Sequence, residues 1–226
     1  MQQIHLQRGE GYEFIAYLDD DDQWLPEKLE RQLARFNKCD ENVAMVYCNG
    51  IRAETGQEYL GNKKLEGNLY NELLRGDFIG TFTGPLLRIK CLEAIGGFDE
   101  QMKAHQDYET WIRLSQRYSI TFIDEVLFRK HNNDHGEQIS SDLTRYIEAR
   151  ERIFHKNEDY LLKNTITYYA ALSSTVYLCI QAGKPAKSFS FMIKAVKLRP
   201  LSIRSNIILL LRTVYRVIKH KLKGEE

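Results

Sequence analysis

Residues 14–24 read FIAYLDDDDQW, a short apolar run that ends in four consecutive aspartates and is followed closely by a tryptophan. The apolar part has the length and composition of a buried strand. Four adjacent carboxylates repel one another, so an ordered loop that holds them calls for a compensating cation. Mg²⁺ and Mn²⁺ prefer carboxylate oxygens and often share them with a substrate phosphate. We therefore interpret Asp19–Asp22 as a site for a metal-bound nucleotide, the alternative being a solvated acidic turn without a ligand.

An EF-hand calcium loop is a poor match to this acidic run. Asp19, Asp21 and Gln23 have the spacing of its first ligands, but Trp24 stands where the sharp turn needs glycine.

The segments around the run predict a strand–helix–strand unit. Residues 13–18 and 43–48 are expected as buried strands, with an amphipathic helix from Pro26 to Phe36 between them. The apolar face of this helix would consist of Leu25, Leu29, Leu33 and Phe36. Such a unit is typical of an α/β fold with a parallel pair of strands, in which ligands bind at the carboxyl ends of the strands.

Residues 52–142 predict further short elements of the same fold. In chain order they are a loop or edge hairpin over 52–68, a short helix over 69–75, a strand over 79–89 interrupted at Gly84-Pro85, a helical turn over 90–95 ending in left-handed Gly96-Gly97, a helix over 106–118, and a strand over 120–129 interrupted at Asp124-Glu125. A polar stretch rich in His, Asn and Gly follows over 131–142.

The composition is that of an ordinary globular protein, with 43% hydrophobic and 28% charged residues. The four cysteines show no CxxC spacing, which favours reduced, buried thiols of a cytoplasmic protein over disulfides or a zinc site. The N-terminus has no apolar signal stretch, and no uncharged run reaches the ~20 residues of a membrane span.

Charge divides the chain into two parts. Residues 1–159 contain 20 Lys and Arg against 29 Asp and Glu, whereas residues 160–224 contain 12 Lys and Arg and no acid. From Leu143 onward the pattern is helical throughout. We expect an α/β domain over 1–142 and a helical region over 143–226, each with its own partners.

The last helix, expected over 201–221, is basic and amphipathic. Its apolar residues Ile203, Ile207, Leu210, Leu211, Val214 and Ile218 alternate with Arg204, Arg212, Arg216 and Lys219. It could lie on an anionic membrane surface, or its apolar face could cover the catalytic core. Aromatic and basic residues do not interleave as in a stacking platform, so nucleic acid is not expected as a partner.

A second block supports the metal interpretation. Residues 96–100 read GGFDE, and residues 106–114 read QDYETWIRL. Asp107 alone could be an acid that stabilises a helix N-terminus. Together with the run from Leu18 to Trp24 and the stretch from His131 to Ser141, the two blocks resemble the inverting glycosyltransferases of family 2. The resemblance implies a GT-A-like, Rossmann-type mixed sheet flanked by helices, followed by the all-helical C-terminal region.

The resemblance also implies an activity and its residues. A sugar would pass from a nucleotide diphosphate sugar to the hydroxyl of a glycan or lipid-linked acceptor, with Mn²⁺ or Mg²⁺ as cofactor. A helical tail that rests on the cytoplasmic face of the membrane would suit such an acceptor. Asp19, Asp21 and Asp22 would hold the metal, and Asp107 would be the general base. The residues implied in substrate binding are Asp19, Asp20, Trp24, Gly84, Gly97, Gln106 and His131, with His135 as the alternative to His131.

Two departures from the family pattern lead to expectations of their own. Gln106 stands where the family commonly has Glu, so it cannot raise the pKa of its neighbour by like-charge repulsion. The family's opening strand–helix units, which hold the nucleotide base, have no counterpart in Met1 to Gly11. We therefore expect an N-terminally incomplete sheet with an exposed edge.

Two other classes of function stay open. A non-catalytic adaptor would use the basic tail and keep the acidic loop as a remnant that does not bind donor. A metal-dependent phosphotransferase would use the acidic loop, but the sequence has no Gly-rich phosphate cradle and no Walker-type lysine. The glycosyltransferase is the hypothesis that accounts for both blocks.

Overall fold

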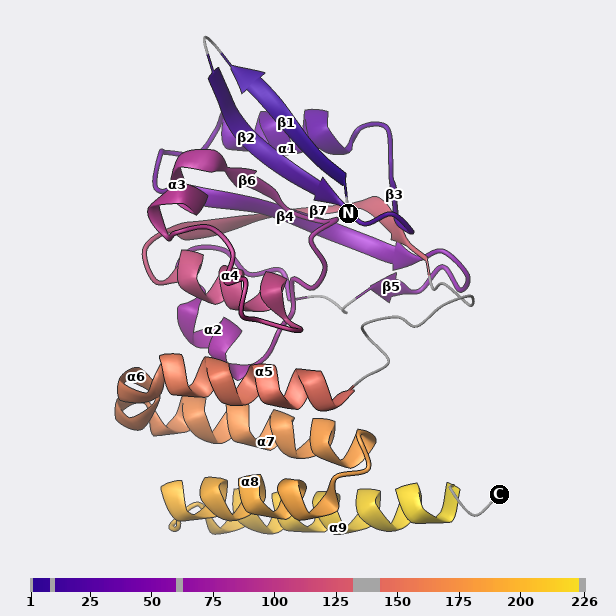
Figure 1. Ribbon diagram of the computed structural model, residues 1–226, viewed down its shortest axis with the longest axis vertical. Helices are drawn as coiled ribbons and strands as arrows, with labels where there is room; N and C mark the ends of the chain where they lie inside the picture. Colours follow the sequence, from indigo (N-terminus) through magenta and orange to yellow (C-terminus); the bar gives the residue numbers. More distant parts are fainter. Residues whose placement is uncertain (1, 9–10, 60–62, 132–142, 224–226) are drawn as a thin grey trace. The chain divides into compact units, whose positions relative to one another are not determined.

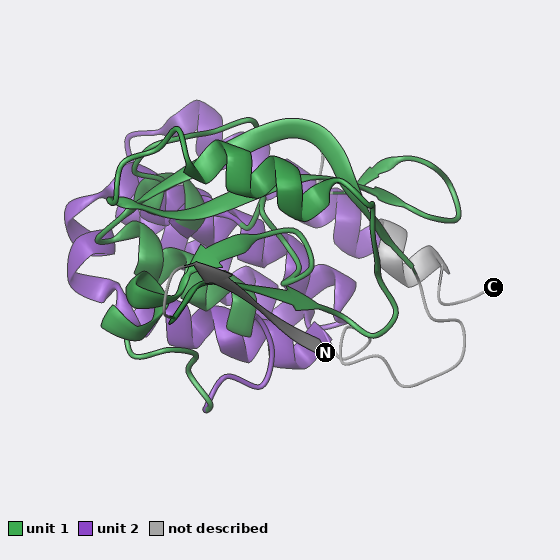
Figure 2. Ribbon diagram, turned by 90° about the horizontal axis from the view of Figure 1, so that it is seen from above, with its two compact units in different colours: residues 1–73, 77–100, 106–136 green, residues 74–76, 101–105, 137–226 purple. Residues whose placement is uncertain are grey.

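The computed structural model describes residues 2–8, 11–59, 63–131 and 143–223, and the chain divides into two compact units. Unit 1 comprises residues 1–73, 77–100 and 106–136, and unit 2 comprises residues 74–76, 101–105 and 137–226 (Figure 2). Residues 132–142 lie outside the described residues, so the domain boundary expected after residue 142 stays a prediction.

Unit 1 is built on a mixed sheet that has seven strands in the described part of the chain. In spatial order they are β1 (Gln2–Arg8), β2 (Gly11–Leu18), β6 (Leu86–Arg88), β4 (Val43–Arg52), β7 (Ser119–Lys130) and β3 (Gln23–Trp24), with β5 (Glu58–Tyr59) paired to β4 (Figure 1). Among the described strands, only β4 and β7 pair in parallel. The expectation of a mixed sheet flanked by helices is confirmed.

The two strands predicted as a parallel pair do not pair with each other. β6 lies between β2 and β4 and runs antiparallel to both, with Ala16 opposite Leu86 and Leu86 opposite Val46. The parallel neighbour of β4 is β7 instead. The pattern around residues 13–48 gives the two strands and their direction, but it contains no information about a third strand from residues 86–88 that enters between them.

β1 is a strand that the sequence analysis does not predict, and it is the last strand at one side of the described sheet. It pairs antiparallel with the whole of β2, from Gln2 opposite Leu18 to Arg8 opposite Gly11. The strand that leads into the acidic run is therefore not an open edge of the sheet. Residues 2–8 contain only two large apolar residues, Ile4 and Leu6, and the sequence analysis predicts no strand there.

Four helices accompany the sheet in the described residues of unit 1: α1 (Lys28–Phe36), α2 (Tyr70–Arg75, ending in unit 2), α3 (Ile89–Ala94) and α4 (Gln106–Ser115). The fully buried positions of α1 are Lys28, Gln32 and Phe36, while Leu29 and Leu33 are partly buried beside them. Gln32 Nε2 donates to the carbonyls of Val46 and Gly84 at 3.0 and 2.8 Å. Buried amide hydrogen bonds, and not only the predicted leucines, thus fix this helix on the sheet.

The predicted strand over 79–89 is much shorter in the structure. Only Leu86–Arg88 is a strand, and residues 76–85 form a loop. Gly80 has φ of +75°, and Oδ1 of Asp77 accepts the backbone N–H groups of Ile79 and Gly80. This side-chain turn takes the place of strand hydrogen bonds, and the loop that it begins contacts the acidic run through Thr81 and Thr83.

β7 confirms the predicted acidic interruption. Its register with β4 passes from Ile123 opposite Cys48 to Val126 opposite Asn49, so Asp124 and Glu125 are looped out of the ladder. Both are exposed, and Asp124 forms an ion pair with Lys64. The interruption is a β-bulge within one continuous strand.

Unit 2 is helical, as predicted. Its helices are α5 (Leu143–Lys156), α6 (Glu158–Lys163), α7 (Thr165–Gln181), α8 (Pro185–Leu198) and α9 (Ile203–Lys223). α7 contacts α5, α8 and α9, and its buried residues include Tyr168, Leu172 and Val176 (Figure 1). Across the part of the chain that the structure describes, no helix combines the length and the apolar character needed to cross a membrane.

Candidate functional site

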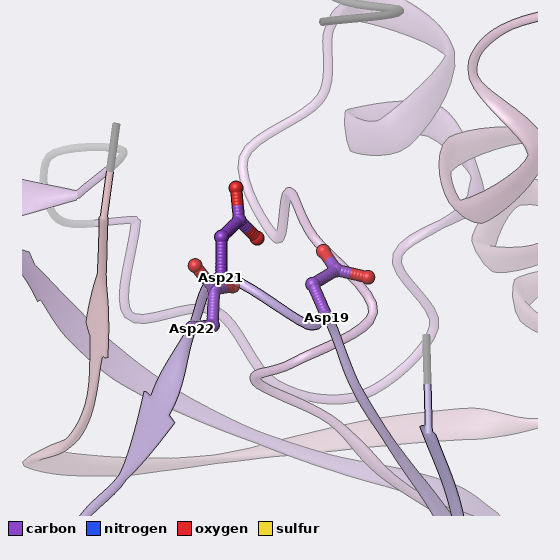
Figure 3. Close-up of side chains that lie close together, drawn as sticks. All are labelled: Asp19, Asp21 and Asp22. Atoms are coloured by element: carbon purple, nitrogen blue, oxygen red, sulfur yellow. The ribbon is translucent and has the colours of Figure 1, made fainter. Parts of the chain in front are cut away.

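The acidic run forms a tight turn at the end of β2. The backbone N–H of Asp22 donates to the carbonyl of Asp19 at 3.1 Å and closes the turn. The side chains of Asp19, Asp21 and Asp22 project from the same side of it (Figure 3). One carboxylate oxygen from each lies within 4.8 Å of the other two. Residues 14–24 thus bring three carboxylates close enough to share one ion, as the sequence predicts.

Two threonines of the 76–85 loop form hydrogen bonds with this turn. Thr81 Oγ1 donates to Oδ2 of Asp19, and Thr83 Oγ1 donates to Oδ2 of Asp22, each at 2.6 Å. Thr83 Oγ1 also accepts the backbone N–H of Asp19 at 3.2 Å. Both threonines are buried, so each hydroxyl meets a carboxylate in a setting with little competition from water.

Asp22 is the most enclosed of the three acids, with a fully buried side chain. Its Oδ1 lies 3.4 Å from Lys130 Nζ and accepts the backbone N–H of His131 at 3.3 Å. Burial raises the pKa of Asp22, although the Thr83 hydrogen bond and the charge of Lys130 act in the opposite direction. Thr83 and Lys130 therefore offset only part of the cost of burying the charged form of Asp22.

The only two tryptophans of the chain both hold the 76–85 loop. Trp24 Nε1 donates to the carbonyl of Thr83 at 2.9 Å, and Trp111 Nε1 donates to the carbonyl of Gly80 at 3.2 Å. Trp24 belongs to the acidic motif and Trp111 to α4. The two sequence blocks, far apart in the chain, thus meet on one loop.

Asp107 is the second residue of α4, and its Oδ1 accepts the backbone N–H of Tyr108 at 2.7 Å. Burial is the largest cause that raises the pKa of Asp107 well above its ordinary value, followed by the charges of Asp77 and then Asp19. An acid with a raised pKa is suited to accept a proton near neutral pH. The repulsion expected to be missing with Gln106 therefore comes from Asp77.

The second block is anchored by one arginine. Arg113 Nε donates to both carboxylate oxygens of the buried Glu109, each at 2.9 Å. Arg113 also donates to the carbonyls of Ile95 and Gly97, each at 2.7 Å. Gly96 and Gly97 have φ of +83° and +70° and terminate α3, as predicted. This network fixes the glycine turn to the helix that carries Asp107.

The other residues predicted to bind substrate lie around the acidic turn or at the start of α4. Asp20 is exposed beside the three acids, and Gln106 begins α4. Gly84 lies under the site, where an added Cβ would meet Phe128 Cε1 at 3.1 Å. His131 meets Asp22 through its backbone N–H. His135 lies outside the described residues.

Five residues near the site were not singled out from the sequence: Tyr59, Asp77, Thr81, Thr83 and Lys130. Burial raises the pKa of Tyr59, with further contributions from Asp77, Asp107 and Asp22. Thr81 and Thr83 belong to a segment predicted as a strand, and that prediction concealed them, whereas Asp77 precedes this segment and no motif marked it. Lys130 ends β7, and a carboxyl-end rule applied to this strand could have found it.

The donor set fits a hard divalent cation. Three carboxylates converge, and Asp19 and Asp22 are held in place by the hydroxyls of Thr81 and Thr83. In the described residues, this is the one group of three or more Asp, Glu, His or Cys side chains close enough to share an ion. All members belong to unit 1.

Residues 5–96 match the family model described as Glycosyl transferase family 2. The chain carries a glycosyl transferase family 2 domain. The match includes the acidic turn and the 76–85 loop, and it confirms the resemblance inferred from the two sequence blocks.

Relatives of this family 2 domain are distant. A glycosyltransferase of Rickettsia typhi that is uncharacterized is 28% identical over 134 residues, which cover 54% of this chain and 40% of that protein. The Escherichia coli UDP-Glc:alpha-D-GlcNAc-diphosphoundecaprenol beta-1,3-glucosyltransferase WfgD is 29% identical over 118 residues, which cover 49% of this chain and 42% of the enzyme. The chain covers less than half the length of these relatives.

Among solved structures, TarS of S. aureus is similar to this chain at 12% sequence identity and a TM-score of 0.44. The match covers 89% of this chain and 40% of TarS.

Proposed function

We propose that this protein is an inverting, metal-dependent glycosyltransferase that moves a sugar from a nucleotide diphosphate sugar to an acceptor hydroxyl. The observation that carries the proposal is the convergence of Asp19, Asp21 and Asp22 within a family 2 domain. The nearby Asp107, whose raised pKa suits a general base, supports it.

The four acids divide into two roles in the proposed reaction. Asp19, Asp21 and Asp22 would hold Mn²⁺ or Mg²⁺, which when bound supplies positive charge to the departing nucleotide diphosphate. Asp107 takes the proton of the acceptor hydroxyl as its oxygen bonds to the anomeric carbon. The bond from that carbon to the diphosphate oxygen breaks in the same displacement. A single displacement of this kind inverts the anomeric centre.

The donor and acceptor classes follow from relatives and are part of the proposal. The name of the E. coli relative gives a UDP-sugar donor and a lipid-linked diphosphate acceptor. We extend both classes to this chain, with cell-surface polysaccharide or glycolipid synthesis at the cytoplasmic side of the membrane as the setting. Asp20, Trp24, Gly84, Gly97, Gln106 and His131 are proposed to contribute to substrate binding.

Calorimetric titration of UDP, GDP and other nucleotide diphosphates, with and without Mn²⁺, tests the donor site. We expect wild type to bind one nucleotide in a Mn²⁺-dependent manner and Asp21→Ala to lose this binding. Asp159→Ala, which removes an exposed aspartate of α6 in unit 2, is the matched control and should bind like wild type. The absence of Mn²⁺-dependent binding by wild type would contradict the proposal and favour the adaptor.

A further inference from the structure

α9 packs against the rest of unit 2 through one face. It contacts α7 and α8, and Thr213 on this face is 1% exposed. Asn206 Nδ2 donates to the carbonyl of Arg199 at 3.0 Å, and Leu209 is half-buried one turn before Thr213. Residues 206, 209 and 213 follow helical spacing, so this is the inward face of the helix.

The predicted apolar stripe of α9 lies on a different face and is exposed. Its side chains are between 39% and 66% exposed, although all are large and apolar. They are Ile203, Ile207, Leu210, Leu211, Val214 and Ile218. The stripe is therefore not the surface that buries this helix in unit 2. A contiguous exposed apolar surface of this kind marks an interaction site.

Cationic side chains accompany this stripe. Arg204 is exposed one residue after Ile203, and Arg212 and Arg216 are also exposed but line a groove together with Tyr169 of α7. The guanidinium of Arg216 lies 4.0 Å from the centre of the Tyr177 ring on α7. Residues 160–224 contain no Asp or Glu. The partner of this surface must therefore combine apolar contact with negative charge.

We propose that α9 docks in the plane of an anionic lipid surface, with the stripe from Ile203 to Ile218 entering the interface and Arg204 and Arg212 meeting the headgroups. A helix with an apolar face and basic residues binds such a surface through burial of the apolar side chains and through attraction of the cations to anionic headgroups. A second copy of the chain is the less suitable occupant, because it would bring two segments of the same positive charge together. The proposal does not depend on the proposed glycosyltransferase activity.

Vesicle co-sedimentation of the full chain tests the docking. We expect wild type to bind vesicles of 70% phosphatidylcholine and 30% phosphatidylglycerol and to bind pure phosphatidylcholine much more weakly. Ile207→Ser combined with Leu211→Ser should weaken binding by more than about tenfold, since two apolar side chains lose their burial in the lipid. Arg204→Gln combined with Arg212→Gln should weaken it by at least about fivefold, as should 0.5 M salt.

Leu162→Ser combined with Ile166→Ser is the matched control for apolar exposure. These residues of unit 2 are 51% and 58% exposed but lie outside the stripe, so their replacement should leave binding unchanged. Circular dichroism establishes that each variant remains folded. Equal binding of wild type to both vesicle types, no binding to either, or full binding by the Ile207/Leu211 variant would overturn the proposal. A wild-type dimer that this variant disperses, without vesicle binding, would assign the stripe to a second copy instead.

Discussion

Thr83 Oγ1 donates a 2.6 Å hydrogen bond to Oδ2 of Asp22 while it accepts the backbone N–H of Asp19. One buried side chain thus fixes both ends of the acidic turn. Replacing a group that orients a metal ligand typically lowers metal affinity by roughly 10–100-fold. We predict that Thr83→Val weakens Mn²⁺-dependent nucleotide binding about 10–100-fold. Calorimetric titration with the nucleotide that wild type prefers measures the effect.

Thr175→Val is the matched control for this substitution. Thr175 is also a fully buried threonine, but its hydroxyl donates to the carbonyl of Ala171 within α7, in unit 2. Its replacement should leave nucleotide affinity unchanged. Wild-type affinity in Thr83→Val would mean that the acidic turn keeps its geometry without this contact.

Asp107→Asn is predicted to abolish sugar transfer and to preserve Mn²⁺-dependent nucleotide binding. The amide keeps the shape of the carboxylate but cannot accept the proton of the acceptor hydroxyl. Product formation from the donor identified by titration, measured beside the titration itself, separates the two effects. Loss of nucleotide binding in this variant would place Asp107 in the donor site and not at the acceptor.

The same substitution should stabilise the protein, increasingly so as the pH rises. The pKa of Asp107 is higher in the folded chain than its ordinary 3.8, because burial and Asp77 oppose its charge. The folded state therefore retains a proton that the unfolded state loses, and stability falls with pH between the ordinary and the raised pKa. Thermal melts of both proteins from pH 4 to 9 should show the advantage of Asp107→Asn growing over this window. A constant difference across the series would contradict the raised pKa.

The positions of the main elements were predictable because their signals are local. The apolar run before Asp19, the apolar run over 43–48, the bulge at Asp124-Glu125 and the glycine end of α3 all follow from periodicity or turn chemistry. The three metal-binding candidates were predictable for a similar reason, since adjacent residues on one turn necessarily lie close together.

Contacts between distant segments were not predictable in this way. β6 pairs between β2 and β4 through three residues, and no local pattern records that choice. Thr81 and Thr83 read as strand residues, although they serve as hydrogen-bond partners of acids about 60 positions earlier. Lys28 is fully buried in α1, where its Nζ donates to Gln32 and lies 4.3 Å from the Trp24 ring, against the usual exposure of lysine.

Arg113→Lys is predicted to destabilise the protein by about 2–4 kcal/mol. The guanidinium donates hydrogen bonds to buried Glu109 and to two backbone carbonyls at once. The single ammonium of lysine cannot make all of these hydrogen bonds. Urea unfolding measures the loss. Arg117→Lys is the matched control, because the exposed Arg117 donates to the carbonyl of Ala94 only from the surface, and its replacement should cost less than about 0.5 kcal/mol. Equal effects of the two variants would contradict the role assigned to Arg113.

Gly50→Ala is predicted to destabilise the protein through a single collision. A Cβ at Gly50 would lie 2.2 Å from Cζ of Phe128, a residue 1% exposed and packed in the core. Forcing this ring aside should cost about 1–3 kcal/mol in urea unfolding. In a Phe128→Leu background the ring is absent, so the cost of Gly50→Ala should fall well below its value in wild type.

Gly11→Ala is the control for this cycle, because a Cβ at Gly11 meets nothing within 4 Å and its effect should be small in either background. If Gly50→Ala costs the same with and without the Phe128 ring, the glycine is required for a reason other than this contact. Phe128 pairs with Trp24 across β3 and β7 and packs against Tyr59. A Gly50 effect that Phe128→Leu relieves would therefore show that Gly50 leaves the room for the ring that lies beside these two residues.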